Sequence, residues 1–237
     1  MTAIRKAMIM GAGLGSRMRP LTDKMPKPLV PFMDKPLIDH ALERLEAAGV
    51  EEVVVNLHYK ADILETHLKR RAHPRIVFSD ERDALLDTGG GLKKARPLFG
   101  EDPIFVMNSD TVWAEGMVPV MERMKAFWDP ARMDALLMLA PAVTTIGECR
   151  LGDFNMDGAG RLIRRKEAHV APFMFAGVQI FHPRLLEGAP DGAFSTNRLW
   201  DKAAEEGHLF GLRLDGVWMH VGTPHDLKEA ERFMQEL

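Results

Sequence analysis

The segment with the clearest chemical character is the glycine-rich stretch at residues 11–20, which follows a short apolar run at residues 7–10. Glycines permit positive φ angles and close approach of the backbone to a ligand, so consecutive N–H groups can surround phosphate oxygens. Arg17 adds positive charge, and Lys27 follows within a Pro-Lys-Pro sequence. These residue types in this order predict a binding site for a polyphosphate, whereas a bare glycine turn would not need the basic residues.

Two commoner phosphate-binding loops do not match this segment. A P-loop ends in Gly-Lys-Ser/Thr, and a dinucleotide-binding fingerprint has a third glycine where Ser16 stands, followed at once by a helix. Pro20, Pro26 and Pro28 exclude a long helix over this region, because proline lacks the backbone N–H and clashes with the preceding turn. The sequence therefore predicts a long, basic loop.

Composition limits the classes of function. A chain of 237 residues with 46% hydrophobic residues can bury the core of one large α/β domain, and we expect a single domain over residues 1–237. The net charge of −3 gives no electrostatic basis for nucleic-acid binding. The one cysteine, Cys149, excludes an intramolecular disulfide and is expected to be a buried, inert thiol. Because no apolar run resembles a signal peptide or a membrane span, we expect a cytoplasmic protein. We also expect no obligate protein partner.

The hydrophobic pattern predicts an α/β fold with a mostly parallel sheet covered by helices on both faces. Ligands gather at the carboxyl ends of such strands, where the basic loop and the segment 108–110 would meet. The expected strands are 7–10, 53–55, 76–78, 104–107, 135–140 and 173–181, with a hairpin around 157–160, and the expected helices are 36–48, 61–71, one starting at Leu92, and 224–236.

Asp110 follows the apolar run 104–107 within the sequence Asn108-Ser109-Asp110. A carboxylate there could hold a divalent cation, and Mg²⁺ prefers carboxylate, phosphate and water oxygens. Asp also caps many turns, which is the alternative interpretation of Asp110.

The sequence Gly-x-Gly-x-Arg followed by Pro-Lys-Pro resembles the signature of the sugar-1-phosphate nucleotidyltransferases. The resemblance implies a Rossmann-like (GT-A-like) sheet with a smaller irregular β-rich acceptor part, and a reaction of a nucleoside triphosphate with a sugar 1-phosphate that requires Mg²⁺. It also implies catalytic roles for Arg17, Lys27 and Asp110, the last as a metal ligand. Nucleotide contacts would come from Gly11, Ala12, Gly13, Gly15 and Asn108.

A second glycine cluster, Gly89-Gly90-Gly91, lies where the family contacts the nucleobase. The resemblance makes Gly89 and Gly90 base neighbours, and it makes Glu81 a base-reading residue, since many relatives carry Gln or Glu near this place. Without the resemblance, the cluster would be interpreted as a flexible loop or the entry to a helix.

The segment from Trp218 to Thr223 departs from the family pattern Trp-x-Asp-x-Gly-Thr, because His220 replaces the aspartate that usually binds the metal. Imidazole suits transition metals better than a hard cation. His220 is therefore a candidate metal ligand with open alternatives: an indirect metal contact, a phosphate contact as imidazolium, or a hydrogen-bonded spacer while Asp110, phosphates and water hold the metal.

The resemblance places the acceptor near Asp153 and Gly177. The basic run 164–166 could contact the acceptor phosphate, although a run of solvent-exposed charges is the commoner interpretation. Leu-x-Thr-Gly-Gly-Gly and Gly-Asp-Phe look most similar to the N-acetylmuramate-1-phosphate uridylyltransferase branch of cell-wall recycling, which uses UTP, and no hexapeptide-repeat acyltransferase domain is expected. The alternatives are a mannose-1-phosphate guanylyltransferase, a glucose-1-phosphate uridylyl- or thymidylyltransferase, and a non-catalytic nucleotide-sugar-binding protein.

Overall fold

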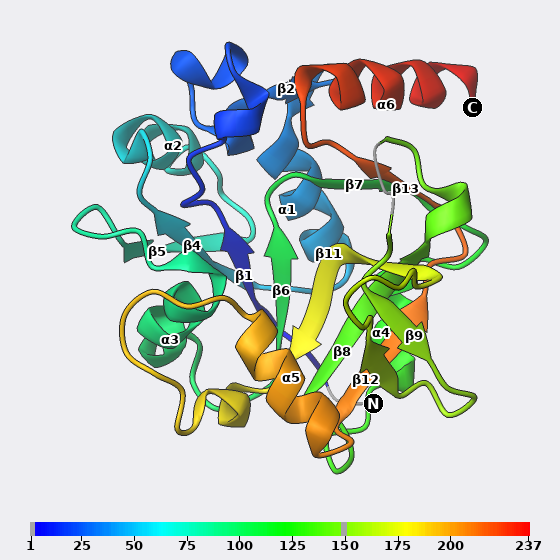
Figure 1. Ribbon diagram of the computed structural model, residues 1–237. Coiled ribbons are helices and arrows are strands. Elements are labelled where there is room, and N and C mark those ends of the chain that lie inside the picture. Colours follow the sequence, from blue (N-terminus) through cyan, green and yellow to red (C-terminus); the bar gives the residue numbers. More distant parts are fainter. Residues whose placement is uncertain (1–2, 148–150) are drawn as a thin grey trace.

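The computed structural model describes residues 3–147 and 151–237, so Cys149 lies outside the described residues. Within these ranges nine strands form one central sheet (Figure 1). Its first half is parallel, as the alternating pattern predicts. This half consists of β1 (Lys6–Met10), β4 (Glu52–Leu57), β5 (Arg75–Asp80) and β6 (Ile104–Asn108).

The second half of the sheet is mixed. The long strand β11 (Phe173–Phe181) lies antiparallel beside β6 and joins the two halves. The remaining strands of the sheet are β8 (Ala135–Pro141), β9 (Phe154–Met156), β10 (Leu162–Arg164) and β12 (Leu209–Arg213). Strands β9 and β10 form the expected hairpin. Two small sheets pair β2 (Pro31–Phe32) with β3 (Lys35–Pro36), and β7 (Thr111–Ala114) with β13 (Val217–His220).

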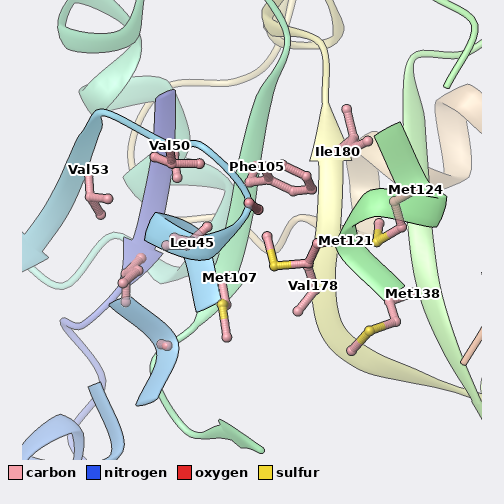
Figure 2. Packing of buried hydrophobic residues seen from close by; sticks show 14 of the residues in the cluster. Leu45, Val50, Val53, Phe105, Met107, Met121, Met124, Met138, Val178 and Ile180 are labelled. Carbon is pink, nitrogen blue, oxygen red and sulfur yellow. The ribbon is translucent and has the colours of Figure 1, made fainter. Parts of the chain in front are cut away.

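Helices cover both faces of the sheet because neighbouring strand residues point to opposite sides. In β1, Ala7 and Ile9 belong to the core under one set of helices and Met8 to the core under the other. The first set comprises α1 (Leu37–Ala47), α2 (Ala61–Leu68) and α4 (Val120–Phe127), and the second α3 (Asp87–Phe99) and α5 (Asn197–Glu205). Figure 2 shows the first core, where Phe105 and Met107 of β6 face Val178 and Ile180 of β11.

The last helix, α6 (Pro224–Glu236), has the predicted bounds and packs on a third, smaller core. Thr223 and Asp226 form a reciprocal capping box at its start, which satisfies backbone N–H groups that the helix itself leaves free. In Figure 1 this helix lies beside β2, near the β7–β13 pair. No helix in the described ranges is both long and apolar enough to cross a bilayer.

Helix α1 is one residue shorter at each end than expected, and two boundaries of other helices differ from the prediction by more. Helix α2 ends at Leu68 rather than at residue 71, and α3 begins at Asp87, so the glycine triplet lies within its first turns rather than before it. Packing explains the second difference. A Cβ on Gly89 would lie 2.3 Å from the Phe194 ring, and one on Gly90 would lie 2.3 Å from the Gly192 carbonyl oxygen. The glycines therefore allow the helix to form against the segment 192–194.

Candidate active site

A cavity of about 660 Å³ opens at the carboxyl ends of the parallel strands. Its walls come from the basic loop, the ends of β4 and β6, and the segment that leads into α3. It brings together most of the residues that the sequence suggests: Gly11, Ala12, Gly13, Gly15, Arg17, Lys27, Glu81, Asn108 and Asp110. The edge of the sheet predicted to hold a ligand therefore carries the largest share of the candidate residues.

The basic loop contains short 3₁₀ helices rather than a long helix, as its prolines predict. Gly15 takes a φ of 64° before the first of them (Ser16–Met18), which favours glycine at this position. The N–H of Gly11 donates to Asn56 Oδ1 at 2.7 Å, so Asn56 of β4 fixes the start of the loop. The backbone from Ala12 onward lines the cavity.

Lys27 and Asp110 form an ion pair in the wall of the cavity. The side chain of Lys27 is 13% exposed and that of Asp110 is 28% exposed, so both are sheltered but open to a ligand in the cavity. Lys27 starts a 3₁₀ helix (Lys27–Leu29), and Asp110 lies in the turn between β6 and β7. Arg17 is exposed and lines the same cavity. Two cations and a carboxylate therefore lie beside the loop amides.

Glu81 is a fully buried carboxyl group in the cavity wall. Its Oε1 accepts a hydrogen bond of 2.9 Å from Asn56 Nδ2, and its Oε2 has no hydrogen-bond partner among the described residues. Burial raises the pKa of Glu81 above that of an ordinary glutamate. Asn56 thus connects the start of the basic loop with the Glu81 carboxyl group, a connection that the sequence alone does not indicate.

His220 lies beside the cavity but is not among its lining residues. It pairs with Thr111 across β13 and β7, and its ring centroid lies 5.5 Å from that of Trp218. A Cβ on Gly222 would lie 2.4 Å from His220 Nε2, so the ring sits close against that glycine. Burial lowers the pKa of His220, which favours the neutral imidazole.

A second cavity, of about 320 Å³, adjoins the first. The two share Met10, Asp87, Thr88 and Asn108 in their walls. Asp153 lines the second cavity, and its Oδ2 accepts a hydrogen bond of 2.9 Å from the N–H of Phe175. The walls also contain residues that sequence reasoning missed, namely Gln179 of β11, Trp200 of α5 and the segment 195–197.

Three glycines that the sequence suggests as ligand contacts, Gly89, Gly90 and Gly177, do not line either cavity. The N–H groups of Gly89 and Gly90 donate to the carbonyl oxygen of Phe194. Gly177 has a φ of 79°, and a Cβ there would lie 1.8 Å from Thr111 Oγ1. It lies where the register between β11 and β8 shifts, so its absent side chain allows a close contact between β11 and β7.

Comparison with known proteins agrees with this geometry. A family model described as "Nucleotidyl transferase" matches residues 6–145, which includes the basic loop, Glu81 and Asp110. The chain belongs to this family. It is a sugar-1-phosphate nucleotidyltransferase, as the residues of the basic loop predict.

Named relatives cover almost the whole chain. The chain is 46% identical over 235 residues to an N-acetylmuramate alpha-1-phosphate uridylyltransferase of Caulobacter vibrioides, with 97% of each protein covered. It is 32% identical to a mannose-1-phosphate guanylyltransferase catalytic subunit beta of Xenopus tropicalis, over 93% of this chain and 62% of that protein.

Solved structures have the same fold. A putative glucose-1-phosphate thymidylyltransferase of Bacillus anthracis superimposes with a TM-score of 0.79 at 16% identity, covering 98% of this chain and 96% of that chain. HddC of Yersinia pseudotuberculosis superimposes with a TM-score of 0.75 at 24% identity, covering 97% of this chain and 100% of that chain. The expected GT-A-like architecture, with a sheet that is parallel around the basic loop and an irregular β-rich part beside it, is confirmed.

The family generally uses a divalent metal, and acidic side chains line the first cavity. Asp110, Asp87 and Glu81 are the carboxylates among its described lining residues. Asp110 lies in the turn after β6, next to the loop amides, and carboxylate oxygen is a preferred ligand of hard divalent cations. His220 lies outside these lining residues and is packed against Gly222, and its role toward a metal stays a prediction.

Proposed function

We propose that this protein transfers the uridylyl group of UTP to N-acetylmuramic acid 1-phosphate, giving UDP-N-acetylmuramic acid and pyrophosphate. One observation carries the proposal: Arg17, Lys27 and Asp110 share a cavity with the loop amides, and that cavity adjoins a second one suited to an acceptor. The choice of substrates is supported by the 46% identity to a uridylyltransferase of that name. A place in cell-wall recycling is part of the same proposal.

The first cavity would hold the triphosphate. Arg17 and the N–H groups from Ala12 to Gly15 would bind the phosphates that leave as pyrophosphate, because both offer fixed positive potential. Asn56 would keep the loop in shape through its bond to Gly11. In this way the charge of the leaving group is balanced by groups that are already in position before the reaction.

Lys27 would lie between the α-phosphate and the acceptor phosphate. An oxygen of the sugar phosphate is already an anion, so it can attack the α-phosphorus directly once the repulsion between the two phosphates is reduced. The bond to pyrophosphate breaks as the new phosphorus–oxygen bond forms, and no covalent enzyme intermediate is required. Catalysis then consists mainly of positioning and charge stabilisation.

Asp110 would hold Mg²⁺ together with phosphate and water oxygens. The bound ion would supply positive charge to the triphosphate. Lys27 pairs with Asp110 in the structure described here, so substrate binding would redirect the ammonium from the carboxylate to the phosphates. Glu81 is the proposed base-reading group. Its Oε1 is held by Asn56, so a base would have to contact Oε2, and that contact requires nucleotide binding to uncover this buried atom.

A pyrophosphate-release assay tests the proposal. The purified protein is incubated with Mg²⁺, one of UTP, GTP, dTTP and CTP, and one of the 1-phosphates of N-acetylmuramic acid, N-acetylglucosamine, mannose and glucose. We expect the highest kcat/KM with UTP and N-acetylmuramic acid 1-phosphate. Faster release with another pair would replace the proposed substrates, and nucleotide binding without release in any combination would favour a non-catalytic nucleotide-binding protein.

A further inference from the structure

The wall of the second cavity has a single positively charged side chain among its described residues, Arg164 at the end of β10. Arg164 lines the second cavity but not the first, so it lies beyond the boundary that Asp87, Thr88 and Asn108 form between them. The phosphate of an acceptor would meet Lys27 in the first cavity. A cation on the far side of the boundary is therefore placed for another part of the acceptor.

The guanidinium of Arg164 is held in a defined orientation. Its Nε donates to Asp201 Oδ1 at 2.5 Å and its Nη2 donates to Asn197 Oδ1 at 3.2 Å, both on α5. Its central carbon lies 5.2 Å from the centroid of the Phe154 ring, within the range of a cation–π contact. Contacts with α5 and with β9 thus limit the motion of a side chain that would otherwise be flexible.

These contacts use only part of the hydrogen-bonding capacity of the side chain. An arginine has five N–H donors, and the two bonds to α5 use one on Nε and one on Nη2. Both N–H groups of Nη1 and one of Nη2 remain without a partner among the described residues. The edge formed by Nη1 and Nη2 is the one that binds a carboxylate with two parallel hydrogen bonds.

We infer that Arg164 is a specificity-determining residue that recognises a carboxylate on the acceptor, so that the second cavity selects an acidic sugar 1-phosphate over a neutral one. The inference rests on the proposed function, because it assumes a sugar 1-phosphate in this cavity. Asp153 and Gln179 supply the cavity with acceptors and donors for hydroxyl and amide groups of the sugar. Arg164 supplies the charge that distinguishes the acidic sugar.

A purely structural role explains these contacts less well. The side chains of Arg164 and Asp201 are 34% and 49% exposed, and ion pairs with such exposure contribute little to folding. The neighbouring Arg165 has a structural role by comparison. Its guanidinium donates to the backbone carbonyls of Gly152 and His169 and so holds a loop in place, and Arg165 does not line the cavity.

The test compares two acceptors that differ by a carboxylate-bearing group. N-acetylmuramic acid 1-phosphate carries a lactyl carboxylate, and N-acetylglucosamine 1-phosphate has a hydroxyl in its place. With UTP and Mg²⁺, Arg164→Gln should lower kcat/KM for the acidic acceptor by about 10- to 100-fold, the range for a lost charge-assisted hydrogen bond, and for the neutral acceptor by less than about threefold. Arg164→Lys, which keeps the charge without the planar fork, should lie between Arg164→Gln and the unaltered protein.

Arg198→Gln is the matched control, because Arg198 is an exposed arginine of α5, the helix that Arg164 contacts, and does not line the cavity. It should leave kcat/KM for both acceptors unchanged. Equal losses for both acceptors in Arg164→Gln would assign Arg164 to the common phosphate or to folding and overturn the inference, as would no loss for the acidic acceptor. Absence of pyrophosphate release by the unaltered protein with every acceptor would refute the proposed function itself.

Discussion

Replacing Lys27 with alanine is the most informative single change in the first cavity. The proposed role of Lys27 is to reduce the repulsion between two phosphates as they approach, an interaction that is strongest in the transition state. Lys27→Ala should therefore lower kcat much more than it raises the KM for UTP. The measurement is steady-state pyrophosphate release at varied UTP and saturating acceptor.

The size of the effect follows from the position of the side chain. Lys27 is 13% exposed and pairs with Asp110, so its charge is only partly screened by water. Loss of a preorganised electrostatic group in such a site costs about 10²-fold or more in kcat, equivalent to roughly 2.7 kcal/mol. The loss of folding stability should be far smaller, about 1 kcal/mol or less, because Asp110 remains at the edge of an open cavity.

Lys24→Ala provides the control, since Lys24 is an exposed lysine of the same basic loop and is not among the lining residues. It removes the same charge and should leave kcat within about twofold of the unaltered protein, the scale of a screened surface charge. A folded Lys27→Ala variant with unchanged kcat would refute the role of Lys27. A change confined to the KM for UTP would show instead that Lys27 binds the nucleotide equally in the ground and transition states.

Three further changes test the other groups of the site. Asp110→Asn keeps the size of the side chain but removes its charge, so kcat should fall by about 10²-fold or more and more Mg²⁺ should be needed, as a metal titration of activity would show. His220→Asp should remain active with an equal or lower half-maximal Mg²⁺ concentration, and a folded but inactive variant would show that His220 has its own function. Because burial raises the pKa of Glu81, the folded protein binds this proton more tightly than the unfolded chain, and stability is lost as pH rises from about 4.5 through the raised pKa. Glu81→Gln removes this loss of stability. The Tm of the variant minus that of the unaltered protein should therefore increase from about pH 4.5 to about pH 8 in thermal unfolding. A difference in Tm that does not change with pH would contradict the reasoning.

The parallel half of the fold and the first cavity could be predicted from the sequence because local signals agree there. Apolar runs alternate with amphipathic helices, and parallel strands bring their carboxyl ends to one edge. Lys27 and Asp110 lie 83 positions apart, yet the structure pairs them as this rule implies. The sequence predicts the start of the final helix because Thr223 and Pro224 are both strong start signals.

The sequence does not predict the start of α3, because glycine is a weak helix former and a triplet of glycines is interpreted locally as a flexible loop or the entry to a helix. Tertiary packing decides the outcome: the absent side chains of Gly89 and Gly90 allow the segment 192–194 to approach the helix. This contact joins positions about a hundred residues apart, and no local pattern indicates it.

The second cavity was only partly predictable for a similar reason. Gln179 and Trp200 come from β11 and α5, and neither stands in a recognisable sequence pattern. Trp200 Nε1 donates to Gln179 Oε1 at 2.9 Å, and the Trp200 ring packs edge-on against Phe175 at 4.7 Å between centroids. The second cavity is formed by the packing of the mixed half of the sheet against α5. The hydrophobic periodicity within a single strand or helix does not predict that packing.

Product analysis with an isotopically labelled acceptor tests the central claim most directly. N-acetylmuramic acid 1-phosphate with ¹⁸O in its non-bridging phosphate oxygens is incubated with UTP, Mg²⁺ and the protein. The masses of both products are then determined by mass spectrometry. Direct attack of the sugar phosphate on the α-phosphorus predicts UDP-N-acetylmuramic acid that retains all the labelled oxygens, together with unlabelled pyrophosphate. Label in the pyrophosphate, loss of label from the nucleotide sugar, or absence of a nucleotide sugar would contradict the proposed reaction.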